Sequence, residues 1–268
     1  MWDKNMRKDI VVYKNAQKIE LHFLKQSQLS DSQQQHFIEL LTKDELERVN
    51  GFRTSEMKQH ALWVRASLRQ VLSDYSQRHN IAEFEPNKWK FDKLKYGKPY
   101  IKNQPSRFQH IEFNLSHSGE WLLIGITHRK PDNQPFAFGV DIERERSNTN
   151  VMTIAKRYFS ELELKQLQAL ACEKEQRQRF FDLWACKESF IKATGKGLAT
   201  DLTSFSYDFF GVQEPSGFFK VPVIVNNDPL SKKTSWVCYL GKLDDVFRFA
   251  LSVKYTGSNH GYFPIPDE

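Results

Sequence analysis

The sequence predicts an α+β fold, in which helices pack against mainly antiparallel strands. Three observations favour this class. Short segments such as FAFGVDIE alternate apolar residues with small or polar ones, as strands with one buried face do. Longer segments repeat apolar residues every three or four positions, which is the spacing of one helix face. The polar residues SHSGE, at 116–120, separate two apolar segments in the manner of a hairpin turn.

The elements of the first half follow from these patterns in chain order. The first 18 residues are polar and lack a sustained period, so we treat them as an extension that could hold a short strand at 10–13. IELHFL, at 19–24, alternates and predicts a strand. From Asp31 the apolar residues recur three and four positions apart, which predicts a helix that ends near Gly51 and a longer helix over 55–78.

A segment of loops and a hairpin complete this half. Prolines, aromatic residues and the turn-like YGKPY predict short strands and loops over 81–109. IEFNLS and WLLIGIT predict the two strands of a hairpin that turns at 118–120. HRKPDNQP, at 128–135, has the composition of a linker. We therefore expect an N-terminal half over 19–130 and a C-terminal half over 131–268.

The second half begins with the strand FAFGVDIE and continues with helices and further strands. Ser160 and Glu163 are the first and fourth residues of a capping box, which predicts the start of a helix. A longer helix is expected over 175–193, ending at the glycine-containing TGKG. FSYDFF, WVCYLG and FRFALSV predict three later strands.

The composition indicates a globular protein with an anionic partner. Of the 268 residues, 40% are hydrophobic and 21 are Phe, which excludes global disorder. The net charge of +6 favours an anionic partner. No apolar run reaches the roughly 20 residues that cross a bilayer, and the charged start does not resemble a signal peptide. Three unclustered cysteines favour a reducing compartment, so we expect a cytoplasmic protein.

Two carboxylates lie on one face of the strand FAFGVDIE. Alternation places Phe136, Phe138, Val140 and Ile142 on one face, and Ala137, Gly139, Asp141 and Glu143 on the other. The apolar face predicts a core contact. The small residues beside the carboxylates leave room for a bulky electropositive group, whereas a solvated strand face is the plainer alternative.

A second charged group lies on the helix that contains FFDLWACKESFIKATGKG. Its aromatic and aliphatic residues cover about half of the helix surface, and Lys187 and Glu188 fall within that arc. Lys192 lies at the edge of the arc, four residues after Glu188, so the two can pair. Charges that face a core need a counter-charge or a metal. A buried Glu188/Lys192 ion pair and side chains that reach out to solvent are the structural alternatives.

The two charged groups together favour a magnesium site. If Asp141, Glu143 and Glu188 converged without a cation, they would repel one another and their pKa values would rise. A hard divalent ion such as Mg²⁺ would satisfy all three, and it normally takes its other ligands from water and substrate phosphates. This combination points to phosphoryl-type chemistry.

The motifs as a set resemble a known family. GKPY, then FNLSHS, then FGVDIE, then LWACKESFIKATGKGL is similar in order and spacing to the 4′-phosphopantetheinyl transferases of the long, surfactin-synthetase-activating type. The resemblance extends from about Leu40 to Val253. It implies a pseudodimer of two similar α+β halves with the active site at their interface. It also implies transfer of the phosphopantetheine arm of coenzyme A to a serine of an apo acyl or peptidyl carrier protein, with release of adenosine 3′,5′-bisphosphate.

The resemblance assigns a role to each residue of the metal side. Asp141, Glu143 and Glu188 would surround Mg²⁺ on the pyrophosphate of coenzyme A. Glu188 is also the candidate to accept the proton of the carrier serine, and the sequence leaves its two roles, ligand and base, undivided. Lys192 would stabilise charge on the transferring phosphate or orient Glu188.

The same resemblance assigns the side that holds coenzyme A. Ser116 and His117 would bind the phosphates of the adenosine moiety, and Lys98 of YGKP would reach the same end of the molecule. Basic residues of NGFRTSEMKQHALWVR, above all Arg53 and Arg65, are candidates for the 3′-phosphate. A solvated helix face explains these two arginines nearly as well.

Two other functions remain open at this point. The sequence pI near 9 and the 13% aromatic residues would suit a nucleic-acid-binding module, but its phosphates would be repelled by Asp141, Glu143 and Glu188. A catalytically inactive carrier-binding protein of the same fold is the second alternative. We expect neither, and predict a monomeric enzyme that binds no nucleic acid and no membrane. The pathway served, whether for siderophores, nonribosomal peptides, polyketides or polyunsaturated fatty acids, is left open.

Overall fold

The α+β class is confirmed by a computed structural model, which describes residues 7–14, 17–107, 109–130, 136–210, 212, 218–225 and 236–254. The chain forms two compact units. The N-terminal unit comprises 1–93, 99–113 and 120–133, and the C-terminal unit comprises 94–98, 114–119 and 134–268. The units differ from the two predicted halves in the segments 94–98 and 114–119, which lie in the first half of the sequence but belong to the C-terminal unit. Five of the eight residues of the predicted linker, 131–135, lie outside the described residues.

The sheet of the N-terminal unit has the strand order β1-β2-β6-β5. Its strands are β1 (Arg7–Lys14), β2 (Gln17–Lys25), β6 (Trp121–Arg129) and β5 (His110–Ser118). β1 pairs with β2 over its whole length, so residues 7–14 are part of the sheet and not an extension. β2 also pairs with β6, which confirms the predicted strand. Its burial does not alternate as the sequence suggests, because Glu20 and His22 are buried along with Ile19, Leu21 and Phe23.

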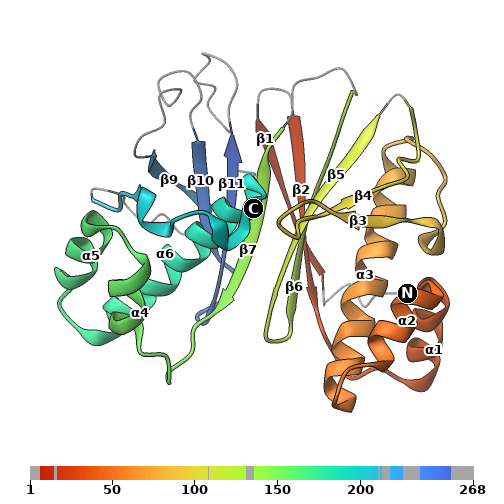
Figure 1. The fold of residues 1–268 in the computed structure, drawn as a ribbon, viewed down its shortest axis with the longest axis horizontal. Helices are drawn as coiled ribbons and strands as arrows, with labels where there is room; N and C mark the ends of the chain where they lie inside the picture. Colours follow the sequence, from red (N-terminus) through yellow and green to blue (C-terminus); the bar gives the residue numbers. More distant parts are fainter. Residues whose placement is uncertain are drawn as a thin grey trace. The chain divides into compact units, whose positions relative to one another are not determined.

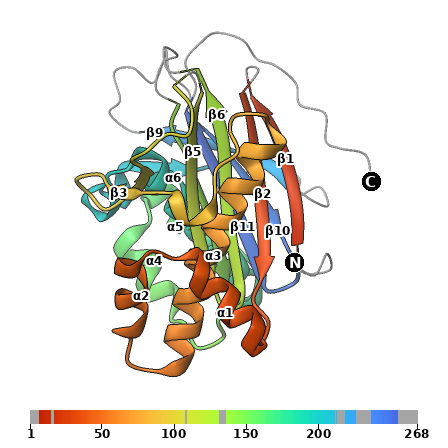
Figure 2. The same ribbon diagram turned by 90° about the vertical axis from the view of Figure 1, so that its right-hand side faces the viewer.

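Three helices belong to this unit. They are α1 (Asp31–Leu40), α2 (Lys43–Asn50) and α3 (Ser55–Arg78), and Figure 2 shows α3 beside β6. The single helix predicted from Asp31 to Gly51 is wrong, because Leu41 is extended and Thr42 begins a new helix. Thr42 and Glu45 form a capping box that an analysis of apolar spacing does not detect. The prediction for α3 is confirmed at both ends.

Shorter elements lie between α3 and the hairpin. They are a 3₁₀ turn at Pro86–Lys88 and the strands β3 (Phe91–Lys93) and β4 (Pro99–Ile101), which agree with the expected short strands and loops. The hairpin itself turns at Gly119, whose φ of 55° lies in the region that favours glycine. Within the described part of the chain, no helix combines the length and apolar character needed to span a bilayer.

Glu20 makes the N-terminal unit sensitive to acid. Its side chain is 3% exposed and contacts Lys18 (2.9 Å), His79 (2.7 Å) and Arg78 (3.1 Å). Burial by itself raises the pKa of Glu20, but the hydrogen bonds from Lys18 and His79 and the charge of Arg78 outweigh it and lower the pKa to about 2. Because the pKa is lower in the folded state, ionised Glu20 stabilises the fold above about pH 5, and this stabilisation is lost as the pH falls toward 2.

We therefore expect Glu20→Gln to remove part of the acid sensitivity of unfolding. Wild-type protein should lose on the order of 3 kcal/mol of unfolding free energy from this group between pH 6 and pH 2, and the variant should not. Urea unfolding at several pH values measures the difference. The control is Glu47→Gln, at an exposed position of α2. Parallel pH profiles for wild type and Glu20→Gln would contradict the assignment.

The sheet of the C-terminal unit has the strand order β7-β11-β10-β9-β8. Its strands are β7 (Phe138–Arg144), β11 (Phe247–Lys254), β10 (Trp236–Lys242), β9 (Phe218–Val225) and β8 (Phe205–Tyr207). All four pairings are antiparallel. β9 was not predicted, because Pro222 within it is atypical of a strand interior.

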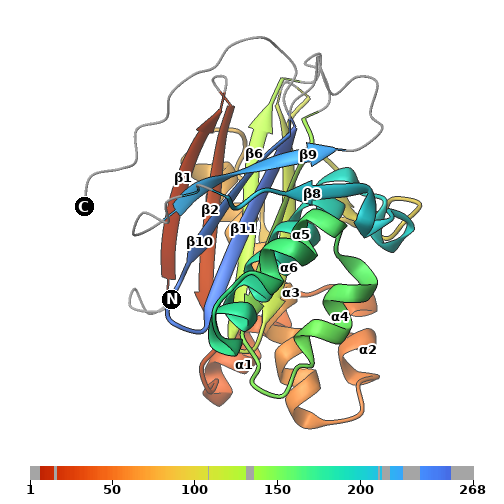
Figure 3. The same ribbon diagram turned by 90° about the vertical axis from the view of Figure 1, so that its left-hand side faces the viewer.

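The helices of this unit gather on one face of its sheet, as Figure 3 shows. They are α4 (Val151–Tyr158), α5 (Glu161–Gln168) and α6 (Glu173–Thr194), of which α4 was not predicted. The capping box of Ser160 and Glu163 is confirmed at the start of α5. α6 ends at Gly195, whose φ of 68° suits the left-handed residue after a helix. Figure 1 shows α6 alongside β7, β11 and β10.

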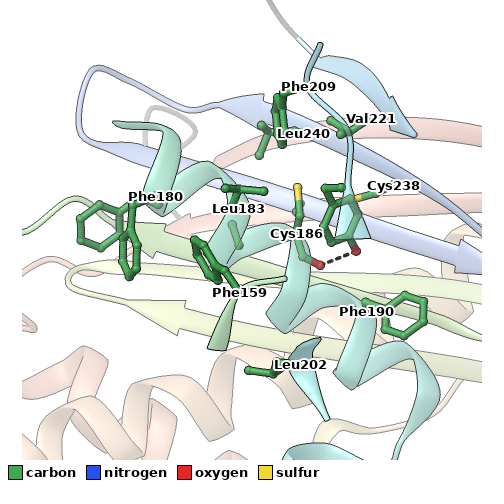
Figure 4. Close-up of a cluster of buried hydrophobic side chains, with 14 of the residues drawn as sticks. Phe159, Phe180, Leu183, Cys186, Phe190, Leu202, Phe209, Val221, Cys238 and Leu240 are labelled. Carbon is green, nitrogen blue, oxygen red and sulfur yellow. Dashed lines mark hydrogen bonds between the residues drawn. The ribbon is translucent and has the colours of Figure 1, made fainter. Parts of the chain in front are cut away.

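The core between α6 and the sheet is rich in aromatic residues. Figure 4 shows Phe159, Phe180 and Phe190 with aliphatic residues and Cys186 around them, and the Cys186 carbonyl accepts a hydrogen bond from the Tyr207 hydroxyl (2.8 Å). Lys187 enters this core at 0% exposure. Its ammonium contacts Glu163 (2.9 Å) and donates to the carbonyls of Leu202 and Phe205. The positive charge of Lys187 on the apolar side of α6 is therefore paired within the protein.

Candidate functional site

β7 lies directly against α6 because Gly139 has no side chain. A β carbon at Gly139 would lie 2.3 Å from the Ala193 nitrogen and 2.3 Å from the Ser189 carbonyl oxygen. The space that the sequence analysis left for an electropositive group is thus filled by the backbone of α6. The helix brings the electropositive group with it, since Lys192 reaches the carboxylates of β7.

Asp141 is the most buried of the three carboxylates, with an exposed fraction of 2%. Its Oδ1 accepts hydrogen bonds from the Lys192 ammonium (2.6 Å) and the Ser116 hydroxyl (2.7 Å). Lys192 therefore pairs with Asp141, which differs from the Glu188/Lys192 ion pair that the sequence offered as a structural alternative. Burial raises the pKa of Asp141, and the charge and hydrogen bonds of Lys192 and Ser116 offset only part of that increase.

Glu143 and Glu188 are half-buried near Asp141. Burial and the negative charges of Asp141 and Glu188 raise the pKa of Glu143 to about 7, against the opposing charges of Arg146 and Lys192. Burial and the charge of Asp141 also raise the pKa of Glu188, and Lys192 opposes them. The three carboxylates from β7 and α6 are therefore close enough to affect one another's ionisation.

This donor set fits a hard cation, although it is not arranged as a finished coordination shell. The Asp141 Oδ2 is buried and has no hydrogen-bond partner among the described residues. An unpartnered carboxylate oxygen beside two carboxylates with raised pKa values is chemically suited to Mg²⁺, which takes further ligands from water and substrate. In the part of the chain that the structure describes, no group of three or more His, Cys, Asp or Glu side chains is positioned to hold a metal ion.

The end of β5 faces β7 with three polar side chains. Asn114, Ser116 and Ser118 are 3%, 6% and 6% exposed, whereas His117, between the two serines, is exposed. Ser116 donates to Asp141, so its proton points to a carboxylate and not to solvent. His117 is exposed, and Ser116 can donate to an external phosphate only if it breaks its hydrogen bond to Asp141.

Lys98 lies in the segment 94–98 of the C-terminal unit. Its ammonium donates to the carbonyl oxygens of Phe138 (3.1 Å) and Ala193 (3.4 Å), which are at the start of β7 and near the end of α6. Lys98 therefore joins the two elements that carry the carboxylates. The YGK turn is brought to the site by this contact, which no local pattern indicates.

The two predicted arginines belong to the N-terminal unit. Arg53 is exposed in the turn between α2 and α3. Arg65 is half-buried on α3, and its guanidinium donates to the Ala61 carbonyl (3.0 Å). They are not among the residues that the C-terminal unit brings together.

Asn114 and Ser118 are the site residues that the sequence analysis missed. Asn114 accepts a hydrogen bond from the Val140 N–H (2.9 Å), and Ser118 accepts one from the Arg144 N–H (3.1 Å). The alternation of Asn, Ser and Ser in FNLSHS was a signal that could have found them, because residues two apart on a strand share a face.

Comparison with known proteins gives matches in both halves of the chain. Residues 137–240 match the 4′-phosphopantetheinyl transferase superfamily, and residues 27–128 match the family of the N-terminal region of 4′-phosphopantetheinyl transferase. The chain is 35% identical over 179 residues to 4′-phosphopantetheinyl transferase Sfp of Bacillus subtilis, covering 66% of this chain and 70% of that protein. It is 33% identical over 169 residues to 4′-phosphopantetheinyl transferase HetI of Nostoc, covering 63% and 65%.

A human protein is similar over a longer stretch. The chain is 26% identical over 232 residues to the human L-aminoadipate-semialdehyde dehydrogenase-phosphopantetheinyl transferase, covering 84% of this chain and 71% of that protein. Both matched regions carry residues discussed above. Asp141, Glu143, Glu188 and Lys192 fall within 137–240, and Lys98, Ser116 and His117 fall within 27–128.

Proposed function

The chain belongs to the 4′-phosphopantetheinyl transferase superfamily and is a phosphopantetheinyl transferase, and we propose that it moves the phosphopantetheine arm of coenzyme A to a serine of an apo acyl or peptidyl carrier protein. The reaction forms a bond between the serine oxygen and the β-phosphorus of coenzyme A, and breaks the bond that joins that phosphorus to adenosine 3′,5′-bisphosphate. The observation that carries the proposal is the convergence of Asp141, Glu143, Glu188 and Lys192 from β7 and α6.

We propose that the three carboxylates hold Mg²⁺. When bound, the ion neutralises the pyrophosphate and makes the bisphosphate a better leaving group. Asp141 offers its buried Oδ2, because its Oδ1 is already occupied by Lys192 and Ser116. Glu143 and Glu188 supply the other protein oxygens from one edge of β7 and from α6.

Glu188 and Lys192 are the proposed catalytic residues. The carrier serine must lose its proton as its oxygen attacks phosphorus, and a carboxylate with a raised pKa is a better proton acceptor than an ordinary one. Burial and Asp141 raise the pKa of Glu188. Lys192, which is 28% exposed, can stabilise the charge on the transferring phosphate while Asp141 fixes its position.

The phosphates of the adenosine moiety are assigned to His117, Ser116, Lys98, Arg53 and Arg65. His117 is exposed and can donate a hydrogen bond to phosphate in its neutral form. Lys98 and Ser116 already contact backbone and carboxylate oxygens, so we assign them supporting contacts. Arg53 and Arg65 are proposed to bind the 3′-phosphate of coenzyme A because their side chains are positively charged.

The partners follow from the same proposal. Carrier proteins are acidic around the modified serine, and the net charge of +6 would steer such a partner toward the enzyme. We propose a cytoplasmic monomer that binds no nucleic acid. Inactive carrier binding is the less favoured alternative, because every acidic residue of the matched motifs is present.

One assay tests the function directly. The protein is incubated with coenzyme A, Mg²⁺ and a panel of apo carrier proteins, and intact-mass measurement detects the added phosphopantetheine arm. We expect transfer to at least one carrier and none when Mg²⁺ is removed with a chelator. Absence of transfer to every carrier, together with absence of coenzyme A binding, would disprove the proposed function.

A further inference from the structure

β7 is an edge strand of its sheet, so half of its backbone groups lack a strand partner on that side. The groups at odd-numbered positions face β11, as the Ala137 carbonyl and the Glu145 N–H do. The N–H groups of Val140, Ile142 and Arg144 therefore point away from β11. Buried backbone donors need acceptors, and an unpaired edge strand must find them elsewhere.

Side chains of β5 supply acceptors for two of these N–H groups. The Val140 N–H donates to Asn114 Oδ1 (2.9 Å), and the Arg144 N–H donates to Ser118 Oγ (3.1 Å). Both acceptors come from the end of β5, and they bind β7 on either side of its carboxylates.

We call Asn114, Ser116 and Ser118 the polar ladder, because their side chains, two positions apart, share one face of β5. Ser116 donates to Asp141 Oδ1 (2.7 Å), between the two backbone contacts. Ser118 also donates toward Glu143 Oε2 (3.5 Å). Each member is less than a tenth exposed, so none is a surface group with water as an alternative partner.

We propose that Asn114 and Ser118 are positioning residues that hold the backbone of β7 on either side of Asp141 and Glu143 and so set the geometry of these carboxylates. The proposal rests on the proposed function, because it assigns the ladder to the metal side of that site. It differs from phosphate binding, since the oxygens of Asn114 and Ser118 are used by β7 itself. Gly119 supports it by allowing close approach: a β carbon there would lie 3.2 Å from Phe247 and 3.4 Å from Arg144.

The test compares Ser118→Ala with a matched control in the full chain. Ser206→Ala removes a hydroxyl that is 4% exposed and donates to Ser160 (2.8 Å), on β8 at the opposite edge of the same sheet. Three quantities are measured: the exchange rates of backbone amide protons, the affinity for Mn²⁺ as a paramagnetic stand-in for Mg²⁺, and kcat and KM for coenzyme A.

For Ser118→Ala we expect faster exchange of the Arg144 amide and a loss of about 10- to 100-fold in Mn²⁺ affinity or in kcat, as when a group that orients a metal ligand is removed. The KM for coenzyme A should stay within about twofold, because Ser118 and Asn114 are assigned no phosphate contact. Ser118→Thr retains the hydroxyl and should restore the wild-type values. Asn114→Ala should have the same effect, with faster exchange of the Val140 amide. It replaces Ser118→Ala as the test variant if Ser118→Ala does not fold.

Two results would overturn the inference. One is a Ser118→Ala variant with the Mn²⁺ affinity and kcat of Ser206→Ala; the other is an increase in the KM for coenzyme A alone, which would make Ser118 a phosphate contact. The outcomes are separable from those of the proposed function. Suppose that wild-type protein transfers nothing, while Ser118→Ala still weakens Mn²⁺ binding and speeds exchange of the Arg144 amide. The positioning role of Ser118 would then be supported and the proposed transferase function contradicted.

Discussion

Gly139→Ala is expected to disrupt the packing of α6 on β7 and to cost about 3 kcal/mol or more of unfolding free energy. The added methyl group would lie 2.3 Å from backbone atoms of both Ser189 and Ala193. Neither contact can be relieved by a side-chain rotation, so the helix must move away from the strand. Because Glu188 and Lys192 are on α6, the same movement would separate them from Asp141 and abolish transfer.

The midpoint of urea unfolding, followed by circular dichroism, measures the effect of Gly139→Ala. The matched control is Gly51→Ala at the end of α2, where φ is −73° and the nearest atoms to a β carbon are 3.5 Å and 3.6 Å away. This control should unfold within about 1 kcal/mol of wild type, because alanine fits both the space and the backbone there. Equal midpoints for the two variants would contradict the close packing of β7 on α6.

Asp141→Ala is expected to reduce kcat/KM by on the order of 10³-fold or more, since it would remove a negatively charged ligand of the proposed metal site. The substitution takes away the partner of Lys192 and Ser116 and the buried Oδ2 that is proposed to bind the cation. Asp141→Asn keeps the shape of the side chain without its charge, and should fail to a similar degree if charge is what the site requires.

The mass-based transfer assay at saturating Mg²⁺ measures the loss, and circular dichroism establishes that the variants are folded. Asp92→Ala is the control, because Asp92 also pairs with a lysine, Lys102 (3.2 Å), but both side chains are largely exposed. Exposed ion pairs of this kind contribute little to the free energy of unfolding, so the variant should stay folded and its turnover should stay within about twofold of wild type. Turnover of Asp141→Ala at the wild-type rate would show that the proposed metal site is wrong.

Nearby sequence was sufficient to predict a helix where the residues of that helix and its caps carry the signal. α3 was predicted within its observed bounds because the spacing of its apolar residues is a signal in the chain itself. The start of α5 was found through its capping box, and the end of α6 through Gly195. The break between α1 and α2 was missed only because apolar spacing outweighed an equally local signal at Thr42.

The site was predictable as a set of residues but not as a set of contacts. Strand alternation places Asp141 and Glu143 on one face, and helix periodicity places Glu188 and Lys192 on one side, so both groupings follow from short stretches of chain. That Lys192 pairs with Asp141 and not with Glu188 follows from packing: the two residues are 51 positions apart, and the absence of a side chain at Gly139 lets α6 approach β7. The contacts of Lys98 with Phe138 and Ala193 have the same origin. Periodicity thus assigns side chains to faces, whereas the partner of each face depends on which distant segments pack together.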